Sequence, residues 1–297
     1  MTFKHIKYSE KIRRAKEELY STDPDQIIKW WWSEWDDYLW WIYGWKIYVV
    51  WAETWVWKST FINQICSNVS NQGWRVVKYS LEDRMEDIWK EELYYQVNRL
   101  RYIDKKPAYD WIKFLNWIYL RDDYRDFQYY VDMADDILSK KQIVELDKEK
   151  QVNINDLCAL MVEECEKWAN MFAIDHLHYF EKIWWERHDL EIESVMQKIN
   201  EIVRKYNVAV FIVAHYRKLN KTRPDNDSFK DASWIKQVAN VIIHIIRDMD
   251  DNETEFVLWK LRWPIKPYSL TATFDLSKFE YSFHKTEQQK ESDEFFN

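Results

Sequence analysis

The chain of 297 residues can form one large α/β domain or two small ones, and with 47% hydrophobic residues it can bury a sizeable core. Its net charge of −8 argues against a protein that coats nucleic acid with its whole surface, although it leaves room for a local basic channel. The three cysteines form no CxxC pair. The sequence has no apolar run of about 20 residues for a membrane helix, and its N-terminus lacks the apolar core of a signal peptide. We therefore expect a cytoplasmic protein without a membrane segment.

Strands and helices alternate along most of the chain. In order, the sequence predicts a short charged helix at 9–20, a turn-rich lead-in at 30–45, a strand at about 46–51, a helix from Lys58, a strand at 75–82, mostly helical chain from 84 to about 168, a strand at 171–175, a helix at 190–207 and a strand at 208–215. The last strand, VAVFIVAH, is apolar throughout, which is typical of a strand buried on both faces of a parallel sheet.

The C-terminal part is predicted to contain strands without intervening helices, at 240–248, 254–262, 269–275 and 279–284. Alternation followed by strands alone predicts an α/β fold, with a mostly parallel twisted sheet flanked by helices and with antiparallel C-terminal strands. The predicted division is an N-terminal linker-helix segment (1–29), one α/β domain (30–284, with a long helical insertion at 84–170) and a disordered tail (285–297).

Glycine and tryptophan occur at unusual frequencies. The chain has 2 glycines and 20 tryptophans, whereas an average chain of this length has about 20 glycines. Many of the tryptophans stand where glycine is expected, in doublets beside predicted turns and just before the run Lys58-Ser59-Thr60. Glycine adopts the positive φ that many turns need, and a doubled indole has no such advantage. We therefore interpret most of these tryptophans as occupying glycine positions; an unusually Trp-rich natural chain is the alternative.

The segment AETWVWKST follows a predicted strand and opens a predicted helix. With glycine at Trp55 and Trp57, it fits the phosphate-loop pattern [AG]xxxxGK[ST], in which backbone N–H groups and a helix N-terminus bind the phosphates of ATP. The predicted nucleotide-binding residues are Ala52, Glu53, Thr54, Trp55, Val56, Trp57, Lys58, Ser59 and Thr60. As written, the two indoles would occupy the space of the anion, so we expect the Trp-bearing chain to bind ATP weakly or not at all. A chance Lys-Ser-Thr at a helix start is the alternative.

Polar residues also follow or end other predicted strands. Glu82 follows the second strand, where a carboxylate can polarise the water that attacks a phosphate. Asp175 ends an apolar strand, as expected of a Mg²⁺ ligand, and His215 ends another, either as a sensor of the γ-phosphate or as a strand cap. Lys260 and Arg262 alternate on one strand and share a face, which is either a solvated edge or a pair of cations that reaches a neighbouring subunit's phosphate.

In this order, the motifs resemble the ATPase domain of DnaB-type replicative helicases, which are ring-forming motors with a RecA-like fold. The matching segments cover most of residues 30–283: AETWVWKST, VVKYSLEDRMEDI, MFAIDHLHYF, VFIVAHYRKLNKTRPDNDSFKDASWIKQVANVIIHIIRD and LWKLRWPIKPYSLTATFD. The SLE after the second strand and the late Lys-x-Arg are the more discriminating features, because many families share the phosphate loop. The missing glycines are the main departure from the family pattern.

The resemblance implies an ATP site that two subunits share. Its residues would be Lys58 and Ser59 for phosphate and Mg²⁺, Asp175 for the metal, Glu82 as catalytic base, His215 as γ-phosphate sensor, and Lys260 and Arg262 acting on the ATP of the neighbouring subunit. Two loops would face a central channel and contact the DNA backbone through Lys182, Arg187, Arg217, Lys218, Lys221, Arg223 and Lys230.

The implied cofactors are ATP and Mg²⁺. The implied partners are single-stranded DNA, other copies of the chain in a hexameric ring, and a primase or loader protein. The function that the resemblance implies is ATP-driven translocation on single-stranded DNA with unwinding of the duplex. Two alternatives stay open: a RecA-like ATPase without unwinding activity, such as a recombination mediator or loader, and a nucleotide-dead Gly-to-Trp variant that keeps only the fold.

Overall fold

The structure is a computed structural model. It describes residues 10, 12–13, 16, 27–30, 32–33, 35–36, 42–52, 58–80, 85–116, 118, 124–145, 153–175, 188–215, 237–247, 253–261, 268–275 and 280–284. Within these ranges, no helix is both long and apolar enough to cross a membrane.

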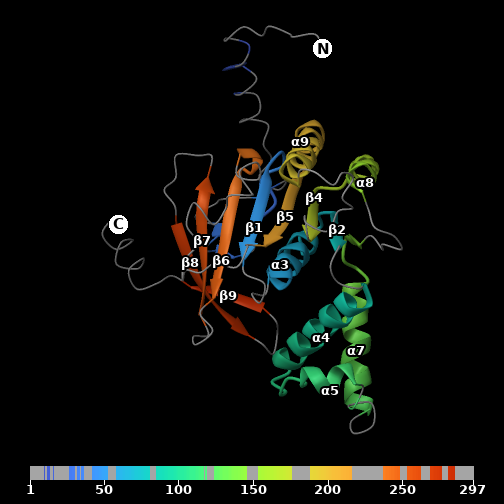
Figure 1. The fold of residues 1–297 in the computed structure, drawn as a ribbon. Helices are drawn as coiled ribbons and strands as arrows, with labels where there is room; N and C mark the ends of the chain where they lie inside the picture. The colour runs from blue at the N-terminus through green and yellow to red at the C-terminus, as the bar shows by residue number, and fades with distance from the viewer. Residues whose placement is uncertain are drawn as a thin grey trace.

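A nine-stranded sheet forms the centre of the described fold, in the order β3-β2-β4-β5-β1-β6-β7-β8-β9 (Figure 1). The strands are β1 (Ile47–Ala52), β2 (Val76–Ser80), β3 (Ile143–Glu145), β4 (Met171–Asp175), β5 (Ala209–His215), β6 (Val241–Arg247), β7 (Glu253–Leu261), β8 (Tyr268–Asp275) and β9 (Glu280–His284). The neighbouring strands β3, β2, β4, β5, β1 and β6 pair in parallel. Strands β7, β8 and β9 continue the sheet beyond β6 with antiparallel pairing. The predicted fold class is therefore confirmed.

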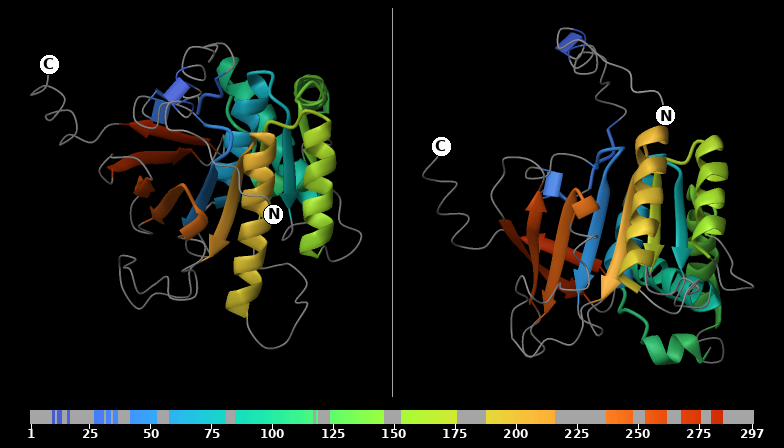
Figure 2. Two further views of the ribbon diagram at one scale, coloured as in Figure 1. Left: turned by 90° about the horizontal axis from the view of Figure 1, so that it is seen from above. Right: turned by 45° about the horizontal axis from the view of Figure 1, so that its top comes forward.

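Helices cover both faces of the parallel part of the sheet (Figure 2). α3 (Lys58–Asn71) lies on one face, and α8 (Ile154–Glu166) and α9 (His188–Tyr206) lie on the other. Three helices form a lobe that projects beyond the end of the sheet (Figure 1): α4 (Met85–Ile103), α5 (Trp111–Leu115) and α7 (Tyr124–Leu138). The result is a three-layer domain with a helical lobe at one end.

Strand β1 shows why the central strands read as continuous apolar runs. All six of its residues are buried. Alternate side chains enter different cores: Tyr48 and Val50 join the cluster on the α3 side, and Val49 and Trp51 join the cluster on the α8–α9 side. A strand covered on both faces has no solvent side, and so the polar–apolar alternation of a surface strand is absent.

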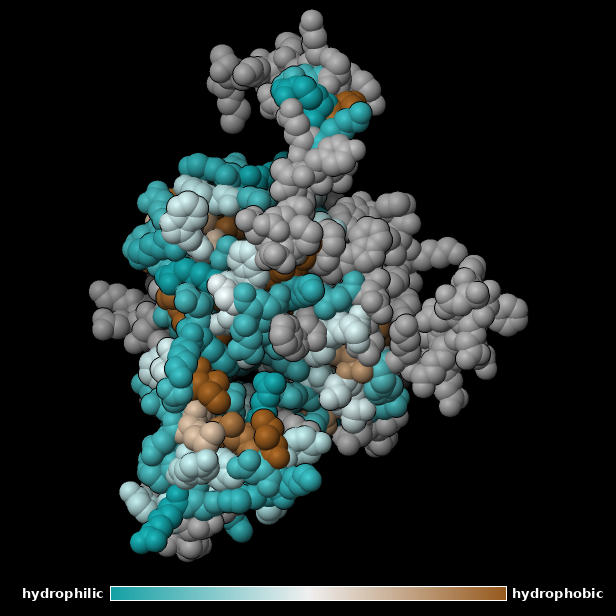
Figure 3. Space-filling model, turned by 180° about the vertical axis from the view of Figure 1, so that it is seen from behind, coloured by the Kyte–Doolittle hydropathy of each residue, from teal (hydrophilic) through white to brown (hydrophobic). Residues whose placement is uncertain are grey.

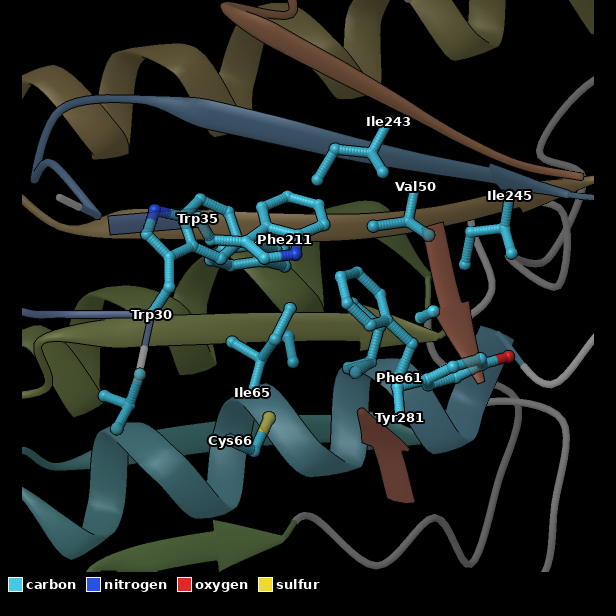
Figure 4. Packing of buried hydrophobic residues seen from close by; sticks show 14 of the residues in the cluster. Trp30, Trp35, Val50, Phe61, Ile65, Cys66, Phe211, Ile243, Ile245 and Tyr281 are labelled. Atoms are coloured by element: carbon cyan, nitrogen blue, oxygen red, sulfur yellow. The ribbon is translucent and has the colours of Figure 1, made fainter. Parts of the chain in front are cut away.

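The lead-in to β1 differs from the expected turn-rich segment. Trp30 and Trp35 are fully buried beneath the sheet, where their rings contact those of Phe211 and Phe61, respectively (Figure 4). Ser33, Trp35 and Asp36 have helical backbone. These two indoles are thus part of the aromatic core, although neither Nε1 has a hydrogen-bond partner within the described structure. An unsatisfied buried N–H costs about 1–3 kcal/mol.

The range 84–170, predicted as helical, contains the short strand β3. It pairs in parallel with β2 at the edge of the sheet, so that Val76 lies opposite Ile143 and Lys78 opposite Glu145. A strand of three residues is too short for its alternation to stand out from flanking helices. The rest of the predicted elements agree with the structure to within about two residues at each described end.

Helices α3 and α8 end in the same hydrogen-bonded motif. In α3 the N–H groups of Gly73 and Trp74 donate to Ser70 and Val69, and Gly73 has φ +86°. In α8 the N–H groups of Trp168 and Ala169 donate to Cys165 and Glu164, and Trp168 has φ +67°. This left-handed position of the Schellman motif is usually glycine, because a side chain there meets the backbone. The backbone at Trp168 therefore favours glycine.

The segment before β1 contains a second such position. Trp45 has φ +55°. Its neighbour Gly44 approaches the chain so closely that a Cβ there would lie 2.4 Å from the carbonyl oxygen of Asn207. Both remaining glycines, Gly44 and Gly73, thus stand where the backbone requires them.

We expect Trp168→Gly to raise the free energy of unfolding by about 1 kcal/mol, because the left-handed conformation costs a residue with a Cβ about 1–2 kcal/mol. The indole is 85% exposed, so its removal sacrifices little packing. Urea denaturation followed by circular dichroism measures the change. Trp168→Ala is the matched control, since it removes the indole but keeps the Cβ. An equal gain from alanine would show that the backbone is not the cause.

Candidate nucleotide-binding site

The carboxyl ends of four neighbouring parallel strands meet at one edge of the sheet. The register pairs Ala52 of β1 with His215 of β5, and Ser80 of β2 with Asp175 of β4. β4 and β5 are themselves adjacent. The last residues of these strands therefore lie in one row, and ligands of open α/β sheets bind at such a row.

Helix α3 begins at the same edge. The Nζ of Lys58, its first residue, is 3.4 Å from the carbonyl oxygen of Ala52, the last residue of β1. Lys58 is only 4% exposed, and the first turn of α3 contains no acidic side chain. The positive end of the helix dipole and a buried ammonium group are thus combined at one point. That combination suits a bound anion such as a phosphate.

Asp175 supplies a carboxylate to this edge. It is the last residue of β4, follows four buried apolar residues and is itself only 5% exposed. Ser59, the second residue of α3, is partly buried. A lysine, a hydroxyl and a carboxylate are the donor types that hold a triphosphate and Mg²⁺. The chemistry of the described residues therefore fits these two ligands.

Much of the predicted site lies outside the described residues. The structure places His215 at the end of β5 and Lys260 on β7 by their backbone only. The predicted site residues that are not described are Glu53, Thr54, Trp55, Val56, Trp57, Glu82, Arg262, Lys182, Arg187, Arg217, Lys218, Lys221, Arg223 and Lys230. The predicted tail at 285–297 and most of the predicted linker segment at 1–29 also lie outside these ranges. The roles of all these residues stay predictions.

Sequence reasoning missed a buried charge cluster that holds β2. Lys78 is 2% exposed, and its Nζ lies 3.1 Å from Oε1 of Glu145 on β3 and 3.9 Å from Oε1 of Glu92 on α4. The indole of Trp89 donates to the other oxygen of Glu145 at 2.6 Å. Burial alone lowers the pKa of Lys78, but the two carboxylates outweigh it and raise that pKa. The one available signal was a single lysine inside the apolar strand VVKYS.

This cluster fixes the strand that leads to Glu82. Its ion pairs connect β2 to the edge strand β3 through Glu145 and to α4 through Glu92. Glu82 follows β2 by two residues. The position of β2, up to its last residue Ser80, thus depends on a charge network inside the protein.

The arrangement of strands, α3 and the carboxyl edge defines a RecA-like ATPase fold. A solved structure described as an ATPase domain matches it with a TM-score of 0.79 at 16% identity, over 95% of this chain and 100% of that one. Another, described as "The Structure Of A DnaB-Like Replicative Helicase And Its Interactions With Primase", matches with a TM-score of 0.75 at 16% identity, over 94% of this chain and 67% of that one. The chain therefore has the fold of the ATPase domain of DnaB-like replicative helicases.

Comparison of the sequence itself gives no such match. No protein-family model matches it, and neither does any curated protein.

We expect Lys78→Met to lower the free energy of unfolding by about 3–5 kcal/mol, because it leaves two largely buried carboxylates, those of Glu145 and Glu92, without their cation. Guanidinium denaturation measures the loss. Lys90→Met is the matched control: Lys90 also lies within reach of a carboxylate, Asp87 at 3.4 Å, but both side chains are well exposed, so the expected loss is about 0–1 kcal/mol. Equal losses from both variants would contradict the role assigned to burial.

Proposed function

We propose that this chain is the ATPase domain of a ring-forming motor that moves on single-stranded DNA and unwinds the duplex. The observation that carries the proposal is the combination of the DnaB-like fold over nearly the whole chain with Lys58 and Asp175 at the carboxyl edge of its sheet. The fold alone supports a helicase ATPase domain. The two residues support nucleotide binding, because ligands of open α/β sheets bind at the carboxyl edge.

In this proposal the chain positions the phosphates and the attacking water. The N-terminus of α3 and Lys58 bind the phosphates, and Ser59 and Asp175 hold Mg²⁺, directly or through water. Bound Mg²⁺ neutralises the charge that develops on the phosphate oxygens. Glu82 accepts a proton from the attacking water, and His215 reports the state of the γ-phosphate to the DNA-contacting loops.

Hydrolysis then depends on assembly. Lys260 and Arg262 of one copy act on the nucleotide of the next, because a cation supplied from a neighbour stabilises the charge of the transition state. A ring, with six copies as the proposed number, gives every site such a neighbour. Lys182, Arg187, Arg217, Lys218, Lys221, Arg223 and Lys230 would contact the phosphates of single-stranded DNA inside it. A primase or loader is the proposed protein partner.

The tryptophans of the phosphate loop give a direct test of the site. We expect the unchanged chain to bind a fluorescent ATP analogue weakly or not at all, and Trp55→Gly/Trp57→Gly to bind it at least about tenfold more tightly, a difference of about 1.4 kcal/mol. Trp184→Gly/Trp185→Gly is the control, since it also replaces two tryptophans by glycine but outside the loop. Micromolar binding by the unchanged chain would show that the loop tolerates both indoles.

The second test uses the Trp55→Gly/Trp57→Gly chain. Its ATPase rate per subunit is expected to rise with protein concentration and with single-stranded DNA, and Arg262→Ala is expected to reduce that rate about 1,000-fold or more while leaving analogue binding intact. A rate that is high at low concentration and indifferent to DNA would contradict the ring. Displacement of a strand from forked DNA is the expected further activity; hydrolysis without displacement would favour the ATPase that does not unwind.

A further inference from the structure

The first turn of α3 carries backbone N–H groups that the proposed nucleotide site uses. The N–H groups at the start of a helix have no partner within the helix, and they point out of its N-terminus toward a bound anion. Those of Lys58, Ser59 and Thr60, the first three residues of α3, are among them. Their direction depends on the rotation of this turn about the helix axis. A contact that fixes the rotation therefore contributes to phosphate binding.

Phe61 holds this turn from the side of the sheet. Its side chain is fully buried, and its ring centroid lies 4.9 Å from that of Phe256 on β7 and 5.5 Å from that of Trp35. One anchored side chain holds the helix against the sheet, but it restrains the rotation of the turn less strictly. A second contact in another direction is needed for that.

Thr60 provides the second contact. Successive side chains of a helix point about 100° apart, so Thr60 and Phe61 face different neighbours. The side chain of Thr60, which is only 4% exposed, forms a hydrogen bond with the hydroxyl of Tyr95 on α4. Tyr95 donates its single hydroxyl proton to Oε2 of Glu91 at 3.4 Å. The hydroxyl of Thr60 is therefore the donor to Tyr95.

Tyr95 is itself held in place. Its ring packs against the hydrophobic cluster on the α3 side of the sheet, and the ring of Tyr94 meets it edge-on at 6.1 Å. Glu92, three residues earlier on α4, lies 3.9 Å from the Nζ of Lys78 on β2. Tyr95 thus contacts Thr60 from a helix that is connected to the sheet.

The space around this hydrogen bond is polar. Between α3 and α4 lies a cavity of about 50 Å³, and its lining includes Thr60, Asn63, Tyr95 and Gln96. Figure 3, which shows the molecule from behind, has a hollow between the main body and the helical lobe. A polar cavity of this size can hold water, which moves with either helix. The direct bond from Thr60 to Tyr95 restrains the two helices more strictly than water can.

We propose that Tyr95 is a positioning residue of the nucleotide site: by holding Thr60, it fixes the rotation of the first turn of α3 and directs the free N–H groups of that turn toward the phosphates. The proposal rests on the proposed function and adds to it a residue of the helical lobe, which the phosphate-loop pattern does not include. In this role Tyr95 touches neither nucleotide nor metal, and it acts through Thr60.

The test measures binding of a fluorescent ATP analogue by the Trp55→Gly/Trp57→Gly chain, with and without Tyr95→Phe. This change removes the oxygen that accepts from Thr60 but keeps the ring, and we expect binding to weaken about fivefold. Inorganic triphosphate, used as a competitor, is expected to lose a similar factor, because the N–H groups bind phosphate. Tyr94→Phe is the matched control: it also removes a hydroxyl from α4, but one that donates to the carbonyl oxygen of Tyr109 at 2.8 Å, and it is expected to leave the affinity unchanged.

A double-variant cycle separates positioning from a general loss of stability. Thr60→Val removes the donor, so it is expected to weaken binding as much as Tyr95→Phe, and the two changes together no more than either alone. Unchanged affinity in Tyr95→Phe, an equal loss in Tyr94→Phe, or fully additive losses in the cycle would overturn the proposal alone. A glycine-bearing chain that binds no nucleotide would overturn the proposed function as well. If Tyr95→Phe fails to fold, the comparison of Thr60→Val with Tyr94→Phe decides.

Discussion

The complete enclosure of β1 is the constraint on which the rest of the structure depends. Because β5 and β6 flank this strand and helices cover both its faces, it has no freedom to shift in register without burying a polar group or opening the core. The position of Ala52, at the carboxyl end of β1, is therefore fixed. Lys58, the first residue of α3, contacts its carbonyl oxygen. Pairing of β5 with β1 and of β4 with β5 sets the positions of their carboxyl ends. Asp175 and His215 therefore lie at the same edge of the sheet as Ala52.

The order of strands and helices could be predicted from the sequence because the strongest patterns are either long or occur at a fixed position relative to a strand. The apolar runs of β1 and β5, the helical period of α9 and the terminal strands all lie where the pattern predicts them. The position of Lys58 at the start of a helix after a buried strand was also predictable, since only a few kinds of site have that context. The position of Asp175 at the end of β4 was predictable for a similar reason, because an acid directly follows a run of apolar residues.

Other features had no local signal. β3 depends on a neighbour, β2, for its hydrogen bonds, and three residues carry too little pattern to reveal it. The burial of Trp30 and Trp35 reflects packing against rings distant in sequence, which turn propensity does not report. Lys78 is one charge in an apolar strand, and its two acidic partners lie in separate elements.

Gly44 and Asn207 approach each other closely at the amino ends of two neighbouring strands. Gly44 lies before β1, Asn207 lies before β5, and the strands run side by side from that contact. A strand in a packed sheet transmits displacement along its length because it can neither stretch nor bend freely. A side chain at position 44 would therefore wedge the amino ends apart and tilt one strand against the other. The two strands would then be misaligned at the carboxyl edge of the sheet, where Ala52 lies beside His215.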